Sequence, residues 1–488
     1  MGVIKRQGIT NAIVTYIGIL IGFANVIFVQ PYFLSSEELG LIRVLYAFSA
    51  LVAMFLPLGI GSITLRYFPN FKDAKEKHYG FFGVMILYLF VGFLLTSLVL
   101  WLLKDMIILR YIKESALFTS YFNFIFPFSF FIAFNNILTV YCQALFKSTI
   151  PSFLNDIYVR IFTILITAVY FLKLVSLDWF IVLNVAVYGL QALILLIYIL
   201  RVDTPSLKIK YSYFKTHNVL DIVKYGLMLC ITAFASLGIK YVDIMMIGQY
   251  LPLAFAGIYS VAAFIPNIIE VPISSLERIS NAKIADEWAK NRTEEVEKIY
   301  YQSTKYLMVI GGLLMVLVTT NIRDLFTLLP NDYSQGVDVV FILSISTFFN
   351  MATGLNGSII LSSKYYYVGT LLLFFLLAVT VISNIIFIPI MGISGAAFAT
   401  ALASFLYNLL KYLFILIKMK MQPFDKYSVL IVGIILVGFA ISYCVPNSEI
   451  PVLNIGLKSA ITVLVYTGLV YGFKLIPEVN NLDKFFRK

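Results

Sequence analysis

Long apolar segments dominate this chain and recur along almost its whole length. Runs of about 20 apolar residues alternate with short polar breaks, and a helix of that length crosses the roughly 30 Å hydrocarbon core of a bilayer. Only 12% of the 488 residues are charged, against about 25% in soluble domains. A soluble globule could not hide so much apolar surface. The sequence therefore predicts an all-α polytopic membrane protein.

Fourteen spans are predicted from the apolar runs between polar breaks. We expect them near residues 8–30, 39–64, 79–103, 116–140, 150–172, 178–200, 222–248, 255–276, 303–321, 337–361, 365–388, 393–417, 427–445 and 453–475. Lys5 and Arg6 precede the first run, which has no small-residue cleavage pattern. The absence of a cleavage pattern favours a permanent first span over a cleaved signal peptide.

Basic residues are distributed unevenly between the predicted loops. With the N-terminus in the cytoplasm, 26 of the 36 Lys and Arg residues fall on the inner side, five on the outer side and five within spans. The inner group includes Arg66, Lys411 and Lys418. An inner excess of this kind sets orientation in a bilayer. We therefore predict a multi-pass protein of the bacterial cytoplasmic membrane with both termini in the cytoplasm, and a net charge of +11 that reflects topology rather than nucleic-acid binding.

The two halves of the chain resemble each other at an offset of 217 residues. LSSEELGLIRVLYAF (34–48) aligns with LPLAFAGIYSVAAFI (251–265), which places Gly40 over Gly257. With the span count, this predicts a parallel repeat of two six-helix bundles. The expected organisation is a bundle at 1–205, a cytoplasmic linker at 206–218, a second bundle at 219–420, and two appended helices with a cytoplasmic tail at 421–488.

The longest polar stretch outside the predicted spans covers residues 277–302. Its apolar residues fall roughly at helical spacing among basic residues. Two interpretations stay open: an amphipathic helix on the inner leaflet, or a simple extension of the neighbouring spans.

Charged residues inside predicted spans are functional candidates, because each costs about 2.5–3.5 kcal/mol at mid-helix on insertion scales. Asp156 and Arg160 lie four residues apart, which suits either a self-neutralising pair or an arginine presented to a pyrophosphate. Lys240 and Asp243 lie deeper in a span and favour a cavity, where Asp243 would exchange a proton or hold a cation.

Other charges allow two interpretations each. Glu270 lies between Pro266 and Pro272, where proline opens the helical hydrogen-bond ladder, and is either an ion-coupling acid or a solvated residue near the inner surface. Arg43 either contacts substrate or extends outward to the interface. Arg66 lies at the inner mouth and suits either a substrate headgroup or an ordinary lipid phosphate. Lys224 and Lys458 lie near helix ends and are predicted to be anchors.

The first predicted span carries a stripe of small and polar residues. Its members recur at spacings of four, three, four and three: Asn11, Thr15, Gly18, Gly22 and Asn25. This spacing places them on one helix face. Such a stripe suits close packing against another helix or a wall that faces sugars.

Four segments resemble the polysaccharide-type flippases of the multidrug/oligosaccharidyl-lipid/polysaccharide (MOP) exporter superfamily. They are QGITNAIVTYIGILIGFANVIFVQPYFLSSEELGLIRV at the start, FLPLGIGSITLRYFP (55–69), KYVDIMMIGQYLPLAFAGIYSVAAFI (240–265) and MGISGAAFATALASFL (391–406). The resemblance touches both halves of the chain. It implies two six-helix bundles around a central cavity, two peripheral helices, and alternating-access movement of a lipid-linked oligosaccharide to the outer leaflet.

One departure narrows the implied substrate. Flippases of peptidoglycan precursor usually carry basic residues in the first helix, whereas no charge occurs here between Arg6 and Glu37. The resemblance therefore favours an O-antigen, capsule or exopolysaccharide repeat unit carried on undecaprenyl pyrophosphate. A multidrug or cation antiporter of the same superfamily stays an alternative. A membrane polysaccharide polymerase or ligase is a weaker one, because the outer loops are short.

The candidate residues divide into two groups. Substrate binding is assigned to Arg43, Arg66, Arg160, Lys240 and Asn25, and ion coupling to Asp243 and Glu270. The expected partners are the lipid-linked oligosaccharide, H⁺ or Na⁺, membrane lipid, and a polysaccharide polymerase with its chain-length regulator. No nucleotide-binding loop occurs and no cofactor is expected. Cys142, Cys230 and Cys444 are too widely spaced for a metal site.

Overall fold

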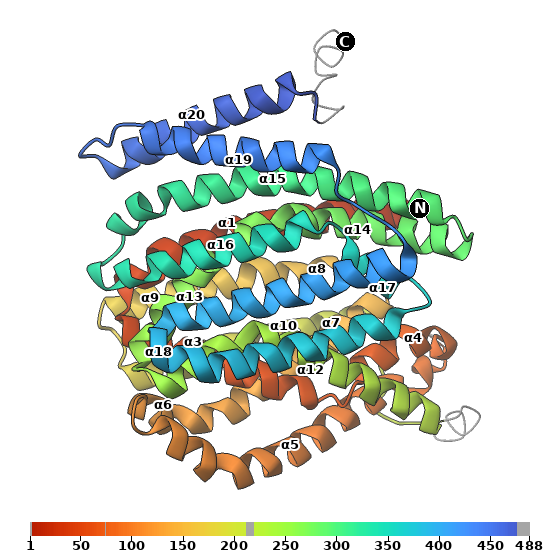
Figure 1. The fold of residues 1–488 in the computed structure, drawn as a ribbon. Helices are drawn as coiled ribbons and strands as arrows, with labels where there is room; N and C mark the ends of the chain where they lie inside the picture. The colour runs from red at the N-terminus through yellow and green to blue at the C-terminus, as the bar shows by residue number, and fades with distance from the viewer. Residues whose placement is uncertain (1, 74, 211–218, 476–488) are drawn as a thin grey trace. The chain divides into compact units, whose positions relative to one another are not determined.

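The computed structural model describes residues 2–73, 75–210 and 219–475, and this described part contains helices and no strands (Figure 1). The chain forms two compact units, residues 1–257 (unit 1) and 258–488 (unit 2). The predicted linker lies partly outside the described residues, as does most of the predicted tail. The predicted bundle boundaries at 205 and 219 stay a prediction.

Unit 1 contains most of the first eight predicted spans. Its helices are α1 (Gly2–Ala24), η1 (Asn25–Val29), α2 (Gln30–Phe33), α3 (Ser36–Phe55), α4 (Ile60–Phe71), η2 (Lys77–Gly80), α5 (Phe81–Tyr111), α6 (Ala116–Tyr121), η3 (Phe122–Phe124), α7 (Ile125–Ala144), α8 (Thr149–Phe153), η4 (Leu154–Tyr158), α9 (Val159–Phe171), α10 (Leu177–Val202) and α12 (Val219–Tyr250). Helix α13 (Leu253–Phe264) crosses the boundary between the units.

Unit 2 contains the remaining helices. They are α14 (Asn267–Ala289), α15 (Thr293–Thr327), η5 (Asn331–Gly336), α16 (Val337–Ala352), α17 (Asn356–Leu361), α18 (Tyr366–Phe414), η6 (Ile415–Met419), α19 (Lys426–Cys444) and α20 (Pro451–Gly472). Its apolar core includes the fully buried Tyr300 and Tyr466, and the Tyr466 hydroxyl donates to the carbonyl of Val309 at 2.9 Å.

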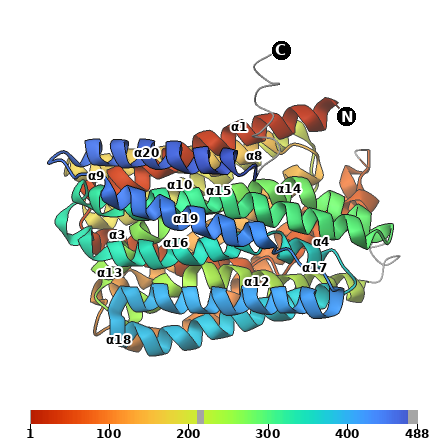
Figure 2. The same ribbon diagram turned by 45° about the horizontal axis from the view of Figure 1, so that its top comes forward.

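The helices of the described chain are long and apolar enough to make a multi-pass membrane protein. Twelve pass that test, and α13 with α14 adds a thirteenth span, bent by 50°. One of the twelve, Tyr366–Met419, covers two predicted spans because the chain folds back at Gly392 (Figure 2). Gly392 has φ 61° and ψ −138°, a conformation open essentially to glycine alone. The predicted set of about fourteen spans is therefore confirmed.

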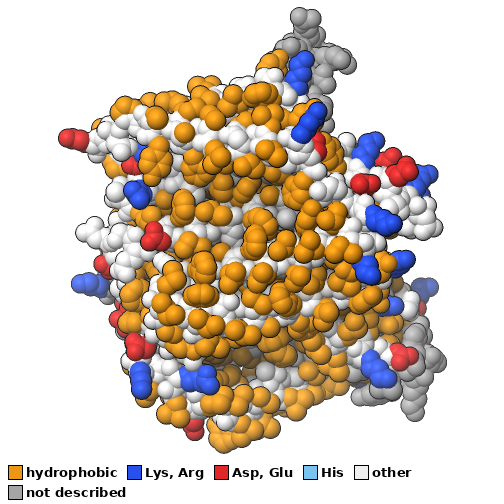
Figure 3. Space-filling view, in the orientation of Figure 1, with side chains coloured by type: hydrophobic (Ala, Val, Ile, Leu, Met, Phe, Trp, Pro, Cys, Tyr) orange, Lys and Arg blue, Asp and Glu red, His pale blue; other side chains and the backbone are white. Residues whose placement is uncertain are grey.

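The outer surface of the helices is apolar, as lipid requires. On the face in Figure 3, hydrophobic side chains cover most of the surface in view, while Lys, Arg, Asp and Glu side chains gather where helices end. Helix α5 shows this clearly: Leu94, Leu102 and Leu109 are 68%, 65% and 70% exposed. In a soluble protein such a surface would aggregate, whereas in a bilayer it faces acyl chains.

The second predicted span differs from the structure. A single helix was expected over 39–64, but α3 ends at Phe55 and α4 begins at Ile60. Gly59 stands at the break with φ 81°, where a Cβ would lie 2.1 Å from the carbonyl oxygen of Gly226. The left-handed turn and the close approach of α12 both require glycine there, and the sequence pattern alone did not reveal the contact.

The polar stretch 277–302 forms no separate surface helix. Helix α14 continues through it to Ala289, and α15 begins at Thr293 after a short turn. The second of the two sequence interpretations, an extension of the neighbouring spans, is the observed one. The bend between α13 and α14 falls at Ile265 and Pro266, and Pro266 is one of the two prolines that flank Glu270.

Candidate substrate-binding and coupling sites

Arg43 lies in a cluster of tyrosines inside unit 1. Its Nη2 donates to Oε1 of Gln30 at 2.6 Å. One turn further along α3, the ring of Tyr46 lies 5.9 Å from the ring centroids of both Tyr188 (α10) and Tyr241 (α12). The Tyr46 hydroxyl is hydrogen-bonded to both phenols, and Arg43 acts electrostatically on all three. A guanidinium, an amide and phenols together can bind phosphate and sugar hydroxyl groups.

Lys240 joins the same cluster through Tyr241. Its Nζ lies 5.3 Å from the centroid of that ring, and its side chain is exposed. Asp243, less than one turn further along α12, is buried with 6% exposed. Lys240 therefore lies beside one ring of the cluster that contains Arg43, although the two candidates are about 200 residues apart in the sequence.

The small-residue stripe of α1 packs against the start of α8, η4 and α9. Asn11 Nδ2 donates to Ser148 Oγ at 2.8 Å, and Thr15 Oγ1 donates to Asp156 Oδ2 at 2.9 Å. A methyl group added at Gly18 would lie 2.6 Å from the Asp156 carbonyl oxygen. The stripe serves close helix packing, the first of its two interpretations.

Asn25 lies at the same seam. It is 4% exposed, and its Nδ2 donates to Thr163 Oγ1 at 3.3 Å. It begins the π-helical turn η1, and the other π-helical turn of this seam, η4, ends just before Arg160. Such π-helical turns often mark functional positions in helices. They are compatible with the predicted substrate role of Asn25, which stays a prediction.

Asp156 and Arg160 form no ion pair within 4.0 Å in the described chain. Asp156 accepts from Thr15 instead, and Arg160 covers Gly22, where an added methyl group would lie 2.8 Å from Nη1. This Nη1 is buried without a hydrogen-bond partner. A direct ion pair is therefore not observed, although the charge of Asp156 still acts on Arg160.

Arg66 lies apart from the Arg43 cluster, on α4. Its side chain is exposed, and its guanidinium carbon lies 4.4 Å from the ring centroid of Tyr225 and 5.5 Å from that of Tyr67. Cation–π contacts of this kind fix a guanidinium at an interface. The arrangement suits either of the two ligands predicted for it.

Glu270 stands in the first turn of α14, directly after the bend, and is half-buried. Seven residues later on the same helix, Glu277 is close enough to act on it electrostatically. Glu277 also acts on Lys411 of α18. The sequence analysis missed this group, since it placed both Glu277 and Lys411 in cytoplasmic segments.

Lys411 is only 5% exposed. Its Nζ lies 4.1 Å from the ring centroid of Tyr407, one turn earlier on α18. The position of Lys411 directly after a long apolar run was a signal in the sequence for a lysine inside the protein. Hydropathy alone could not show whether Lys411 lies in a helix end or in a loop.

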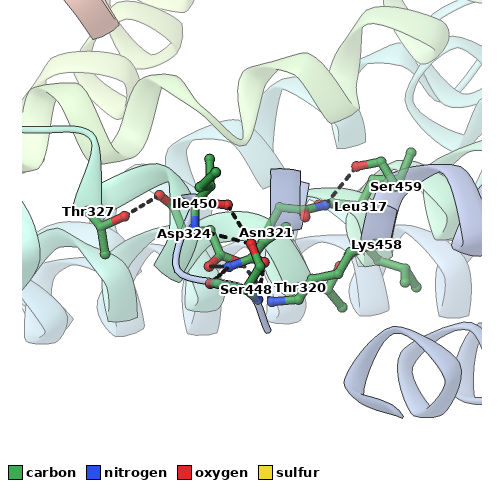
Figure 4. A network of polar contacts seen from close by, with 11 residues as sticks. Leu317, Thr320, Asn321, Asp324, Thr327, Ser448, Ile450, Lys458 and Ser459 are labelled. Atoms are coloured by element: carbon green, nitrogen blue, oxygen red, sulfur yellow. Dashed lines mark hydrogen bonds and ion pairs between the residues drawn. The ribbon is translucent and has the colours of Figure 1, made fainter. Parts of the chain in front are cut away.

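Lys458 was predicted to be an anchor at a helix end and is instead paired. Its Nζ lies 2.7 Å from Oδ2 of Asp324, with side chains 11% and 16% exposed. Asn454 donates to the same carboxylate, and Asn321 donates to Ser459. Figure 4 shows this network between α15 and α20. It fastens α20 to α15.

No group of three or more His, Cys, Asp or Glu side chains in the described chain is arranged to hold a metal ion. The two described units thus offer three kinds of site: the Arg43 cluster, the exposed Arg66, and the acids of α14 near Lys411.

Solved structures share this fold. The lipid II flippase MurJ in an inward closed conformation has a TM-score of 0.75 at 15% identity, covering 96% of this chain and all of that one. An inward-facing multidrug resistance MATE transporter of the MOP superfamily has 0.63 at 11% identity, with 88% and 99% covered. A variant of a Vibrio cholerae MATE transporter has 0.53 at 14% identity, with 85% and 97% covered.

Sequence comparison identifies the family. A search of curated proteins gives no match. The profile of the family described as polysaccharide biosynthesis protein matches residues 4–276, more than half of the chain. The protein has the fold of MOP-superfamily transporters and flippases, and it belongs to the polysaccharide biosynthesis protein family.

Proposed function

We propose that this protein flips undecaprenyl-pyrophosphate-linked oligosaccharide repeat units from the cytoplasmic to the outer leaflet of a bacterial inner membrane by alternating access. The units would feed synthesis of O-antigen, capsule or exopolysaccharide. Family membership supports a role in polysaccharide synthesis. The fold of a lipid II flippase supports movement of a lipid-linked glycan.

The Arg43 cluster is the observation that carries this proposal. Arg43 supplies a fixed positive charge for a pyrophosphate, and Gln30 holds its guanidinium at 2.6 Å. Tyr46, Tyr188 and Tyr241 supply rings and hydroxyl groups, which suit the faces and hydroxyls of sugars. Lys240 adds a second cation beside Tyr241.

The same cluster argues against a multidrug or cation antiporter. The positive charges of Arg43 and Lys240 would each repel a bound cation, by several kcal/mol at 4 Å in a partly desolvated site. An anionic headgroup gains from the same charges. The proposed cycle is coupled to a proton or sodium gradient through Asp243 or Glu270. Asp243 lies on α12 with Lys240, and Glu270 lies in the first turn of α14. A polymerase with its chain-length regulator would take up the product.

The test is flipping by the purified protein in liposomes. A lipid-linked oligosaccharide is placed in both leaflets, and the fraction open to an impermeant periodate reagent is followed with time. We expect the wild-type protein to expose nearly all of the substrate, while empty liposomes expose about half. Arg43→Ala should slow flipping at least tenfold, because about 1.4 kcal/mol of lost binding in the rate-limiting state is a factor of ten.

Two variants make the result specific. Arg43→Lys retains charge without the planar fork and should fall between wild type and Arg43→Ala. Arg201→Ala removes an exposed arginine at the end of α10 and should flip at the wild-type rate. Equal rates for Arg43→Ala and Arg201→Ala would refute the assigned site, and an inert wild-type protein that instead exports cationic dyes would refute the substrate.

A further inference from the structure

Two lysines lie beside the ring of Tyr427 at the start of α19. Lys305 of α15 has its Nζ 4.3 Å from the centroid of this ring, and Lys426 has its Nζ 5.5 Å from the same centroid. Helices α15 and α19 pack against each other within unit 2 (Figure 1). Two ammonium groups beside one ring repel each other, because their charges have the same sign. An anion that contacts both of them would remove that repulsion.

Asp425, the acid at the start of α19, is occupied by other donors. Its Oδ2 accepts from the Tyr301 hydroxyl at 2.7 Å, and its Oδ1 accepts from the backbone N–H groups of Tyr427 and Ser428 at 2.9 and 3.1 Å. The charge of Lys305 acts on this carboxylate, but in the described chain no ion pair within 4.0 Å joins Asp425 to either lysine. Two lysines and one carboxylate leave a net positive charge that suits one more anionic group.

The two lysines lie where α19 enters the hydrocarbon layer. Helix α19 has 19 residues, and at 1.5 Å per residue it is about 28 Å long, close to the roughly 30 Å of a bilayer core. Its first residue, Lys426, therefore lies at the level of the lipid headgroups, where basic side chains meet phosphates. The side chain of Lys426 is exposed, and that of Lys305 is half-buried.

An exposed apolar stripe of α19 continues from Lys426 into the hydrocarbon layer. Residues at spacings of three and four share a helix face, and here they are Lys426, Val429, Gly433 and Leu436. Val429 and Leu436 are 74% and 63% exposed, and nothing lies within 4 Å of a Cβ added at Gly433. A lipid headgroup beside Lys426 therefore has an open apolar path for its acyl chain, which a free phosphate would not use.

We propose that Lys305, Lys426 and Tyr427 (the Tyr427 site) bind the phosphate of an anionic phospholipid of the surrounding membrane. The two non-bridging phosphate oxygens accept hydrogen bonds from the two ammonium groups, and an acyl chain lies along the α19 stripe. A zwitterionic lipid carries a headgroup cation that the lysines repel, so the site selects headgroups with a net negative charge. The bound lipid joins α15 to α19, and this role does not depend on what the protein transports.

Lipid binding to the purified full-length protein in detergent is the first test, measured by native mass spectrometry. We expect one phosphatidylglycerol to bind about fivefold more tightly than phosphatidylcholine, or better. Lys305→Gln and Lys426→Gln should each weaken phosphatidylglycerol binding about fivefold, since one lysine near an anionic headgroup contributes about that factor. Lys305→Arg keeps the charge and should bind as wild type does.

Lys364→Gln is the matched control. Lys364 is an exposed lysine whose Nζ lies 5.2 Å from the ring centroid of Tyr365, where the structure describes no second lysine beside the ring. This variant should bind phosphatidylglycerol as wild type does. Equal affinity of the wild-type protein for the two lipids, or an equal loss in Lys364→Gln and Lys305→Gln, would overturn the Tyr427 site.

The unfolding midpoint of the wild-type protein gives a measurement that needs no variant. A ligand that binds the folded protein raises this midpoint. We expect phosphatidylglycerol to raise it more than phosphatidylcholine in low salt, and about 0.5 M NaCl to remove most of that difference by screening the charges. A difference that is unchanged in high salt would show that Lys305 and Lys426 do not select the lipid.

Flipping in phosphatidylcholine liposomes separates two sources of a phosphate, the membrane lipid and the pyrophosphate of the proposed substrate. We expect Lys305→Gln and Lys426→Gln to flip the oligosaccharide at the wild-type rate there. Slow flipping by both, with wild-type affinity for phosphatidylglycerol, would assign the lysines to the substrate and overturn the lipid site. If the wild-type protein flips nothing but binds phosphatidylglycerol as expected, the flippase proposal is wrong and the lipid site stands.

Discussion

Arg160 covers Gly22 across the seam between α9 and α1, and a methyl group on Gly22 would lie 2.8 Å from its Nη1. Four residues earlier on α1, Gly18 meets the backbone carbonyl of Asp156 instead. The two glycines therefore differ in what would have to move if a side chain were added. A guanidinium can shift by rotamer changes, whereas a helix backbone cannot.

Gly18→Ala should destabilise the protein more than Gly22→Ala. A methyl group at Gly18 would lie 2.6 Å from the Asp156 carbonyl oxygen, so α1 must move away, at a cost of about 1–3 kcal/mol for overpacking. Thermal unfolding of the purified protein in detergent measures the difference. Gly433→Ala is the matched control, since nothing lies within 4 Å of its added methyl group, and it should not lower the midpoint. A Gly18→Ala midpoint equal to that control would contradict the packing role.

Removal of one partner from the Asp324–Lys458 pair should cost about 3–5 kcal/mol. Both side chains are largely buried, and the remaining charge would have no compensating partner at 2.7 Å. Asp324→Asn and Lys458→Met are the single variants. The double variant should recover most of the loss, and a double-mutant cycle on unfolding free energies gives the coupling. Additive losses would show that the pair does not hold α20 to α15.

Gln30→Leu should slow flipping without changing stability much. Gln30 accepts from Arg43 at 2.6 Å, so its loss frees the guanidinium to adopt other rotamers. We expect a threefold to tenfold loss, about 1 kcal/mol of positioning energy, smaller than for Arg43→Ala. The liposome assay measures it, with the unfolding midpoint as the control for folding. A rate equal to wild type would mean that Gln30 does not orient Arg43.

Asp425 should make stability depend on pH at the start of α19. Burial of Asp425 disfavours its charged form. Hydrogen bonds from Tyr301 and from the backbone N–H groups of Ser428 and Tyr427 outweigh that burial, as does the nearby charge of Lys305. The pKa of Asp425 is therefore lowered below its ordinary value. A lowered folded-state pKa gives stability that is present above the unfolded pKa and is lost as pH falls through the folded pKa.

Asp425→Asn should therefore lower the unfolding midpoint at neutral pH and remove part of the acid-side slope. The cap and the Tyr301 hydrogen bond at 2.7 Å together suggest a loss of about 1–2 kcal/mol. Unfolding midpoints at a series of pH values below 5 measure the effect. Parallel pH curves for wild type and variant would contradict it.

Some of the candidate site was visible in the sequence because single residues stand out against apolar runs. Arg43, Lys240 and Asp243 were found in this way. Their meeting with Tyr46 and Tyr188 was not predictable, because tyrosines are common in membrane helices and nothing in their spacing identifies which rings face Arg43. Lys411 was missed for the opposite reason: it follows an apolar run so closely that it resembled a loop residue.

The sequence by itself determined the all-helical membrane fold, the number of spans and the small-residue face of α1, because apolar length and helical spacing are local properties of the chain. Only the tertiary structure decided what each polar group meets: α9 for the stripe, Asp324 for Lys458, three tyrosines for Arg43. A charge inside a membrane must find a partner, and its partner comes from another helix tens to hundreds of residues away. Helix packing, which local pattern does not encode, makes that choice.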